Sequence, residues 1–204
     1  VLILTPASLR MNYIQQLTEC GDPIFKKNQY WEFIETRDDD NLIKQLSKIL
    51  SLPYDYIQKN KGAWLVNIKE PSNYDTLTVD DQKSLENQLL KMIRFKYEFI
   101  KYNGLRDDRW DTLTNHGTIN PFDNKIIVID EAHNFVSRIV NKLNQKRTGA
   151  LSMKLYHALM NAKNSRIVLL SGTPIINYPN ELAICFNILR GYIKTWSIPL
   201  NIKR

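Results

Sequence analysis

Three side chains with catalytic potential follow an apolar run in the stretch KIIVIDEAHNF, residues 125–135. They are Asp130, Glu131 and His133, two adjacent carboxylates and an imidazole. Ligands of open parallel sheets bind beyond the carboxyl ends of the strands, where this group falls if the run is a buried strand. One carboxylate can then hold Mg²⁺ through its water shell while the other orients or deprotonates a water, the chemistry of nucleoside triphosphate hydrolysis. The alternative is that the acidic pair only caps the following helix.

Hydroxyl side chains end a second apolar run, LLSGTP, residues 169–174. Its polar end consists of Ser171, Gly172 and Thr173. If this strand lies beside the first, the hydroxyls can hydrogen-bond His133 or the carboxylate of Glu131 and report the state of a nucleotide. A hydroxyl-rich turn without such a role is the alternative.

The opening stretch LILTPASL, residues 2–9, is a third apolar run with polar residues behind it. Thr5 and Ser8 flank Pro6 and offer hydroxyls and backbone amides that can hold a phosphate at the start of a helix. Capping of a helix that begins near Ser8 is equally compatible with the pattern.

The elements that would position these groups alternate along the chain. β-Branched apolar runs typical of strands buried in a parallel sheet occupy residues 1–4, 125–130 and 166–172. Helix-period patterns occupy residues 78–95, 150–162 and 179–191. Thr78 begins the first of these with a capping box, and Gly191 is placed to end the last. This alternation predicts an α/β fold of three layers, a mainly parallel sheet flanked by helices, with right-handed crossovers.

Residues 22–78 fit this alternation least well. Their patterns predict a strand at 29–36, a helix at 38–52 with acidic residues at its positive end, and a strand at 62–69. We interpret this segment as an elaboration of the sheet and not as a second domain.

Composition excludes several other classes of protein. The 204 residues are 43% apolar and 24% charged, which is typical of a globular protein. Two cysteines, far apart, suggest neither a disulfide framework nor a zinc site. Neither an apolar run of about 20 residues nor a signal peptide is present, so we expect a soluble intracellular protein without a membrane partner. The net charge of +7 favours polyanionic partners such as nucleic acid.

Taken in order, LILTPASL, VIDEAH and LLSGTP resemble motifs Ia, II and III of the superfamily-two helicases and translocases. The sequence around them, at 4–17 and 151–191, is more similar to the Swi/Snf-type branch than to DEAH-box RNA helicases. FIKYNGL (99–105) and NILRGYIKTW (187–196) are similar to the nucleoside triphosphatase I and early-transcription-factor ATPases of large DNA viruses. The resemblance covers roughly residues 1–20 and 95–193.

The resemblance implies a RecA-like first motor domain that uses ATP and Mg²⁺. Asp130 would coordinate the metal, Glu131 would activate the hydrolytic water, and His133 would link motif II to motif III. The motif III residues implied in that coupling are Ser171, Gly172 and Thr173. The residues implied in nucleic-acid contact are Thr5, Pro6, Ser8, Arg10, Tyr102 and Asn103. An Asn can contact phosphate or sugar and a Tyr can stack on a base, but packing of Tyr102 in the core is an equal alternative.

One departure from the family pattern bears on activity. Residues 1–204 contain no G-x-x-x-x-G-K-[ST] phosphate loop, which in the family precedes motif Ia. We therefore expect the chain to be part of a first motor domain, with that loop before Val1 and a second, arginine-supplying motor domain after Arg204. Residues 1–204 alone are expected to hydrolyse ATP negligibly.

The resemblance implies a parent protein that hydrolyses ATP to move on nucleic acid, more on DNA than on RNA, in viral transcription. It would then act in the virion or the host cytoplasm, with a transcription complex as a partner. An RNA helicase that separates duplexes is one alternative, and a non-hydrolysing module that docks to nucleic acid or to a transcription complex is another. The basic residues Lys142, Lys146 and Arg147 either line a nucleic-acid path or form an ordinary solvated face.

Overall fold

The computed structural model describes residues 1–145 and 150–191. The chain divides into two compact units, one of residues 1–7 with 100–204 and the other of residues 8–99. We call them the sheet unit and the inserted unit. None of the helices in the described ranges is both long and apolar enough to cross a bilayer.

A four-stranded sheet organises the sheet unit. Its strands lie in the order β4, β1, β5, β6, with bounds Glu98–Lys101, Leu2–Thr5, Ile126–Ile129 and Arg166–Leu169. β1 pairs with β5 and β5 with β6 in parallel, with Leu4 opposite Ile129 and Ile129 opposite Leu169. The carboxyl ends of β1, β5 and β6 therefore meet at one edge of the sheet.

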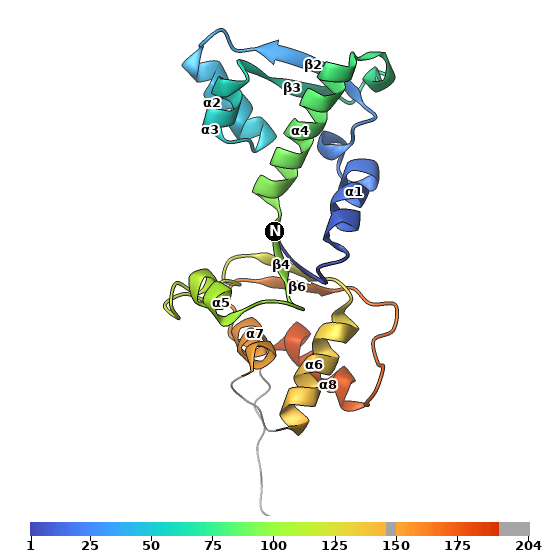
Figure 1. Cartoon of the computed structure of the whole chain (residues 1–204), viewed down its shortest axis with the longest axis vertical. Helices are drawn as coiled ribbons and strands as arrows, with labels where there is room; N and C mark the ends of the chain where they lie inside the picture. Colours follow the sequence, from blue (N-terminus) through green and yellow to red (C-terminus); the bar gives the residue numbers. More distant parts are fainter. Residues whose placement is uncertain (146–149, 192–204) are drawn as a thin grey trace, which may run out of the picture. The chain divides into compact units, whose positions relative to one another are not determined.

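Helices flank this sheet. They are α5 (Asp107–Leu113), α6 (Ala132–Asn144), α7 (Leu151–Met160) and α8 (Asn180–Arg190). Figure 1 shows α6, α7 and α8 on one face of the sheet, where Leu4 and Ile129 are fully buried in the same core as Phe135 of α6. The predicted α/β class with a mainly parallel sheet and flanking helices is confirmed. Gly191 ends α8 with φ 83°, a conformation that favours glycine.

The inserted unit has its own sheet and its own core. Its elements are α1 (Arg10–Cys20), η1 (Pro23–Phe25), β2 (Tyr30–Glu35), α2 (Asp40–Leu50), α3 (Tyr54–Lys59), β3 (Gly62–Asn67), η2 (Tyr74–Thr76) and α4 (Val79–Lys96). β2 and β3 pair antiparallel, with Phe33 opposite Trp64. Figure 1 shows α4 running beside this pair of strands.

The strands and helix predicted within residues 22–78 therefore form, but they do not elaborate the parallel sheet as we expected. β2 and β3 make a separate two-stranded sheet. The physical reason is that this segment and α4 carry enough apolar side chains to form a core of their own. Trp31, Trp64 and Leu89 are buried together in this second core. Sequence periodicity identifies strands but does not say which strand each one pairs with.

α4 is capped as the sequence predicts and occupies almost the predicted range. The hydroxyl of Thr78 accepts a hydrogen bond from the backbone N–H of Asp81 at 3.2 Å. The helix then continues for 18 residues to Lys96, one residue beyond the predicted pattern.

A buried glutamine of α4 takes the place of a neighbouring strand along β3. Gln88 is 1% exposed, and its carboxamide nitrogen donates to the carbonyl of Trp64 at 2.7 Å. The backbone N–H of Trp64 in turn donates to the carboxamide oxygen of Gln88 at 2.7 Å. The amide thus satisfies both polar groups that β3 presents there, which blunts a sheet edge that would otherwise be open to further pairing.

We expect Gln88→Leu to destabilise the inserted unit by about 1–3 kcal/mol, because it leaves the buried N–H and C=O of Trp64 without partners. Hydrogen exchange at the Trp64 amide, together with urea unfolding, measures the effect. Asn87→Leu, at the adjacent exposed position, is the matched control and should change stability by no more than about 0.5 kcal/mol. Equal effects of the two variants would contradict a strand-like role for Gln88.

Candidate functional site

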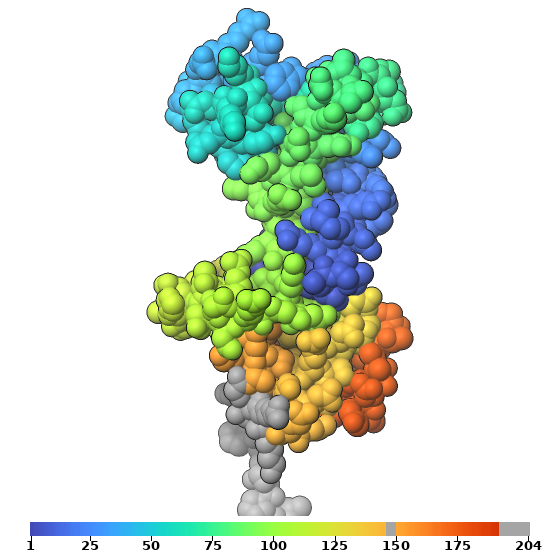
Figure 2. Space-filling view, viewed as in Figure 1, coloured from blue at the N-terminus to red at the C-terminus, as the bar shows by residue number. Residues whose placement is uncertain are grey.

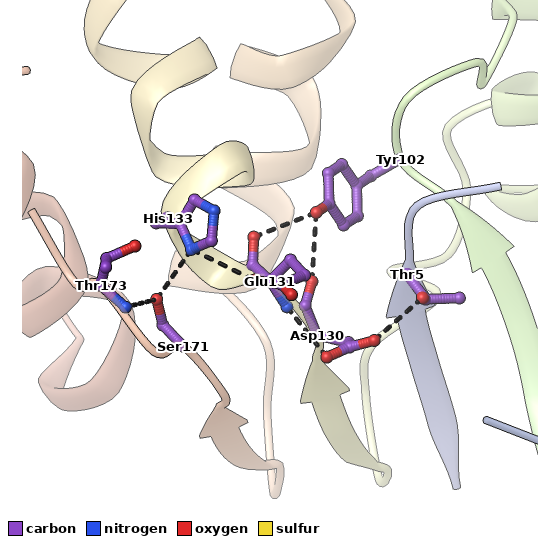
Figure 3. A network of polar contacts seen from close by, with 7 residues as sticks. All are labelled: Thr5, Tyr102, Asp130, Glu131, His133, Ser171 and Thr173. Carbon is purple, nitrogen blue, oxygen red and sulfur yellow. Dashed lines mark hydrogen bonds and ion pairs between the residues drawn. The ribbon is translucent and has the colours of Figure 1, made fainter. Parts of the chain in front are cut away.

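The residues after β5 lie between two neighbouring strands that hold the backbone in place. The N–H of Asp130 donates to the carbonyl of Leu4 in β1 at 2.8 Å. The N–H of Ala132 donates to the carbonyl of Leu170, just after β6, at 2.9 Å. The turn that carries the two carboxylates is therefore fixed at the carboxyl edge of the sheet, as the sequence predicts (Figure 3).

Glu131 has a strained backbone within this turn. Its φ and ψ are 49° and 49°, the left-handed conformation that costs a residue with a Cβ on the order of 1–2 kcal/mol. It occupies the N-cap position of α6, yet its side chain makes no cap hydrogen bond. The side chain keeps 38% of its area exposed. The structure thus does not support the alternative in which this carboxylate only caps the helix, and it leaves the group accessible to a reactant.

Both oxygens of Asp130 are held by donors. The Oδ1 atom accepts from the backbone N–H of Glu131 at 3.0 Å, and the Oδ2 atom accepts from the hydroxyl of Thr5 at 3.2 Å. These two bonds fix the orientation of the carboxylate. One or two carboxylates together with substrate phosphates commonly hold Mg²⁺, so Asp130 fits that ion. In the described ranges no cluster of three or more His, Cys, Asp or Glu side chains forms a separate metal site.

The structure does not place Thr5 where it could contact nucleic acid, as the resemblance implied. Its side chain is fully buried at the end of β1, and Pro6 is buried beside it. The hydroxyl of Thr5 is directed at Asp130, so it positions a carboxylate and presents no surface to a nucleic-acid strand. The pattern LTP located the strand end correctly, but it could not reveal which neighbour the hydroxyl would face.

His133 connects the acidic turn to the loop after β6, as expected for Ser171. The imidazole Nδ1 lies 2.8 Å from the hydroxyl oxygen of Ser171 and 3.3 Å from Oε2 of Glu131. A carboxylate only accepts hydrogen bonds, so the contact with Glu131 favours the tautomer with a proton on Nδ1. Ser171 also accepts from the backbone N–H of Thr173 at 3.2 Å. Thr173 thus joins the network through its backbone, and Gly172 lies between them with open space around it.

Tyr102 is a core residue whose hydroxyl contacts the backbone of the acidic turn. It is 5% exposed, packs edge-on against Phe135 with ring centroids 5.5 Å apart, and directs its hydroxyl at two carbonyls. The hydroxyl lies 3.1 Å from the backbone carbonyl oxygen of Asp130 and 3.1 Å from that of Glu131. Burial, and then the charges of the two carboxylates, raise the pKa of Tyr102 far above its usual range. Of the two alternatives for this residue, the structure has core packing, and base stacking would need a face that is not exposed.

The remaining residues implied in nucleic-acid contact lie elsewhere. Asn103 is exposed directly after Tyr102. Ser8 and Arg10 belong to the inserted unit, where the N-cap of α1 is Leu9 and has no side-chain cap, so Ser8 does not cap that helix. The guanidinium of Arg10 lies over the ring of Phe99, 5.4 Å from its centroid. Lys146 and Arg147 lie outside the described residues.

A buried glutamate that sequence analysis missed organises the loop after Ser171. Glu181, in the first turn of α8, is 1% exposed. One of its oxygens, Oε2, accepts from the backbone N–H of Ile176 at 2.8 Å and of Asn177 at 3.1 Å. The side-chain amide of Asn177 also donates to the hydroxyl of Ser137 in α6 at 2.9 Å. Glu181 thus fixes the loop against both α8 and α6.

Opposing effects set the pKa of Glu181. Burial alone would raise it, but the backbone hydrogen bonds from Ile176 and Asn177, reinforced by the side chain of Ser137, hold the pKa below its ordinary value. The acidic residue in the stretch PNEL was visible in the sequence as a favourable helix start. Its burial was not, because the loop that covers it has no apolar periodicity.

We expect Glu181→Ala to destabilise the sheet unit by about 1–3 kcal/mol and to speed hydrogen exchange at the amides of Ile176 and Asn177, which lose their acceptor. Chemical unfolding and amide exchange measure the two effects. Asp111→Ala removes an exposed carboxylate of α5 in the same unit and serves as the control, with a change within about 0.5 kcal/mol.

The loss of stability caused by Glu181→Ala should decrease as the pH falls. A depressed pKa in the folded state stabilises the protein above the pKa of the unfolded state, and this contribution is lost as the pH falls through the folded value. The difference in unfolding free energy between wild type and Glu181→Ala should therefore narrow below about pH 4. A difference that widened on acidification would contradict an ionised, hydrogen-bonded Glu181.

Comparison with known proteins supports the resemblance seen in the motifs. No family model matches the chain. Over 79 residues, 39% of the chain, it is 40% identical to a protein of African swine fever virus named termination factor NPH-I homolog. Over 137 residues, 64% of the chain, it is 32% identical to a putative ATP-dependent RNA helicase of Acanthamoeba polyphaga mimivirus, and over 111 residues, 54% of the chain, it is 32% identical to a second such protein of that virus.

The aligned segments span 10%, 16% and 17% of the lengths of these three relatives. The chain therefore corresponds to a small part of each of them. Within that part, the similarity confirms the resemblance to the nucleoside triphosphatase I and helicase proteins of large DNA viruses.

Proposed function

We propose that this chain is part of the first motor domain of an enzyme that hydrolyses ATP to move on nucleic acid. The observation that carries the proposal is the pair Asp130 and Glu131, fixed at the carboxyl edge of a parallel sheet and joined through His133 to the loop after β6. Such an edge is where α/β proteins bind nucleotides. The names of the viral relatives, which include helicases and a termination factor, agree with this chemistry.

The two carboxylates have different environments and therefore different roles. Asp130, with both oxygens held by donors, suits a fixed negative charge that would hold Mg²⁺. That ion, when bound, would neutralise charge on the phosphates. Glu131, partly exposed and free of a cap bond, suits the group that orients the attacking water and takes up its proton. Its strained backbone is consistent with a position fixed for chemistry and supported by the flanking strands.

His133 gives the site a means of reporting its state. One ring nitrogen faces both the carboxylate of Glu131 and the hydroxyl of Ser171. A change in the hydrogen bonds of Glu131 during hydrolysis alters which of the two partners His133 engages. Because Ser171 also holds the backbone of Thr173, that change reaches the exposed loop that follows. We infer that this loop passes the state of the nucleotide to the part of the enzyme that grips nucleic acid.

The finer proposal is a Swi/Snf-type translocase on DNA that acts in viral transcription. The African swine fever virus relative, named as a termination factor, favours it. An RNA helicase is the second candidate, favoured by the names of the mimivirus relatives. A docking module without hydrolysis is a weaker account, because it gives no reason for a strained, accessible Glu131 beside Asp130.

We expect Glu131→Gln in the full-length protein to lower ATP turnover by about 10²- to 10⁴-fold, the usual contribution of a positioned general base. Binding of ATP should persist, because the substitution keeps the shape of the side chain. Steady-state hydrolysis and equilibrium binding of a fluorescent ATP analogue measure the two quantities. Stimulation of the wild type by single-stranded DNA, duplex DNA and RNA in turn distinguishes the translocase from the RNA helicase.

Glu70→Gln is the control for this experiment, since Glu70 is an exposed glutamate of the inserted unit and should leave turnover unchanged. Full turnover in Glu131→Gln would refute the assigned role. A wild-type enzyme that hydrolyses no ATP with any nucleic acid would leave the docking module as the better account.

Ser171→Ala tests the coupling separately from the chemistry. We expect basal hydrolysis to persist while stimulation by nucleic acid falls by at least about 5-fold, the lower end of common coupling energies. Thr173→Ala is the matched control, because Thr173 enters the network through its backbone N–H, which the substitution keeps. Equal loss of stimulation in both variants would contradict the particular role of Ser171.

A further inference from the structure

A cavity of about 210 Å³ lies in the sheet unit, apart from the carboxylates but next to the turn that carries them. It is bounded by the residues that follow β4, by α6 and by the start of α7. Among its lining residues are Tyr102, Asn103, Arg138, Lys142, Leu151 and Ser152. Figure 2 shows the surfaces of α6, in yellow, and α7, in orange, adjoining each other.

The charge of this cavity is positive. Arg138 and Lys142 are four residues apart on α6 and so lie on the same side of the helix. Within the described ranges, the lining includes no Asp or Glu, and no ion pair involves either cation. Like charges at this spacing destabilise a helix by about 0.2–0.5 kcal/mol, a cost that a bound anion would remove.

The neighbouring elements add to the positive potential. The first turn of α7 faces the cavity through Leu151 and Ser152, and its N-cap residue, Ala150, supplies no side-chain cap. The positive end of a helix dipole favours an anion. Asn103, exposed at the rim, adds an amide that can donate to an oxygen ligand.

The size of the cavity limits its ligand. Sites that enclose a whole small molecule usually have about 300–1,000 Å³, so 210 Å³ suits one group of a longer ligand. The lining residue Tyr102 also bonds the carbonyls of Asp130 and Glu131, so the cavity adjoins the proposed hydrolytic turn without sharing its carboxylates. A strand of nucleic acid passing this edge of the sheet would present one phosphate after another to it.

We propose that Arg138 and Lys142 bind a backbone phosphate of the nucleic-acid strand in this cavity, with Asn103 at its rim. The inference rests on the proposed function, in that it takes nucleic acid to be the ligand of the parent enzyme. It assigns the contact with the strand to α6, the helix that directly follows Glu131 and carries His133 in its first turn.

The test is the salt dependence of binding of the full-length protein to a fluorescein-labelled single-stranded DNA of 15 nucleotides. Each phosphate contact contributes about 0.7 to the slope of log K against log salt for a single strand. Because both cations face one phosphate, the double variant Arg138→Gln with Lys142→Gln should lower the magnitude of the slope by about 0.7, and Arg138→Gln alone by part of that. Arg138→Lys, which keeps the charge, should retain most of the slope.

Lys163→Gln with Arg166→Gln is the matched control, because it removes two exposed cations at the amino end of β6, the opposite end of the parallel strand. It should leave the slope unchanged. An unchanged slope in the Arg138 and Lys142 double variant, with normal circular dichroism, would overturn the proposal. A weakened affinity for ATP in that variant would also overturn it and would assign the cavity to a nucleotide phosphate. Absence of DNA and RNA binding by the wild type would refute the proposed function itself. If the wild type binds nucleic acid and only the cavity variants have no effect, the cavity proposal fails and the proposed function stands.

Discussion

The parallel pairing of β1, β5 and β6 is the constraint on which the site depends. It brings three strand ends to one edge, and it supplies the carbonyls of Leu4 and Leu170 that hold the backbone of Asp130 and Ala132. Each of these bonds alone contributes on the order of 1 kcal/mol. Together they fix both sides of a single turn, which is enough to offset the left-handed backbone of Glu131. A looser sheet would let that residue relax and would turn its carboxylate away from the edge.

Adjacent carboxylates repel each other, and the structure reduces that repulsion by giving each its own partners. Asp130 is bonded by a hydroxyl and a backbone N–H, while Glu131 has one contact, the imidazole of His133, and keeps much of its surface in water. Hydrogen-bond donors therefore face the first carboxylate, and solvent faces much of the second. This difference leaves the carboxylate of Glu131 accessible, whereas both oxygens of Asp130 already accept hydrogen bonds.

Sequence reasoning succeeded where the information is local and failed where it depends on neighbours distant in the chain. Apolar runs, caps and helix periods identified the three strand ends and the helices α2, α4, α7 and α8, and they indicated Ser171 as a partner of His133. They implied a surface contact for Thr5 and left Tyr102 open between the surface and the core, whereas both are buried and both face the acidic turn. Glu181 was missed because a buried carboxylate becomes reasonable only once the amides of its covering loop are known. The second sheet was missed because alternation does not identify a partner strand.

α6 connects the acidic turn, the loop after β6 and the cationic cavity. It begins at Ala132, directly after the strained Glu131, contacts the loop after β6 through His133 and Ser137, and carries Arg138 and Lys142 at the cavity. At 3.6 residues per turn, His133 and Arg138 are separated by about 140° around the helix, so the two side chains occupy different faces. The remaining face, with Phe135, Val136, Ile139 and Val140, is fully packed in the core. Arg138 and Lys142 are thus connected to Glu131 through one continuous helix that is packed against the sheet.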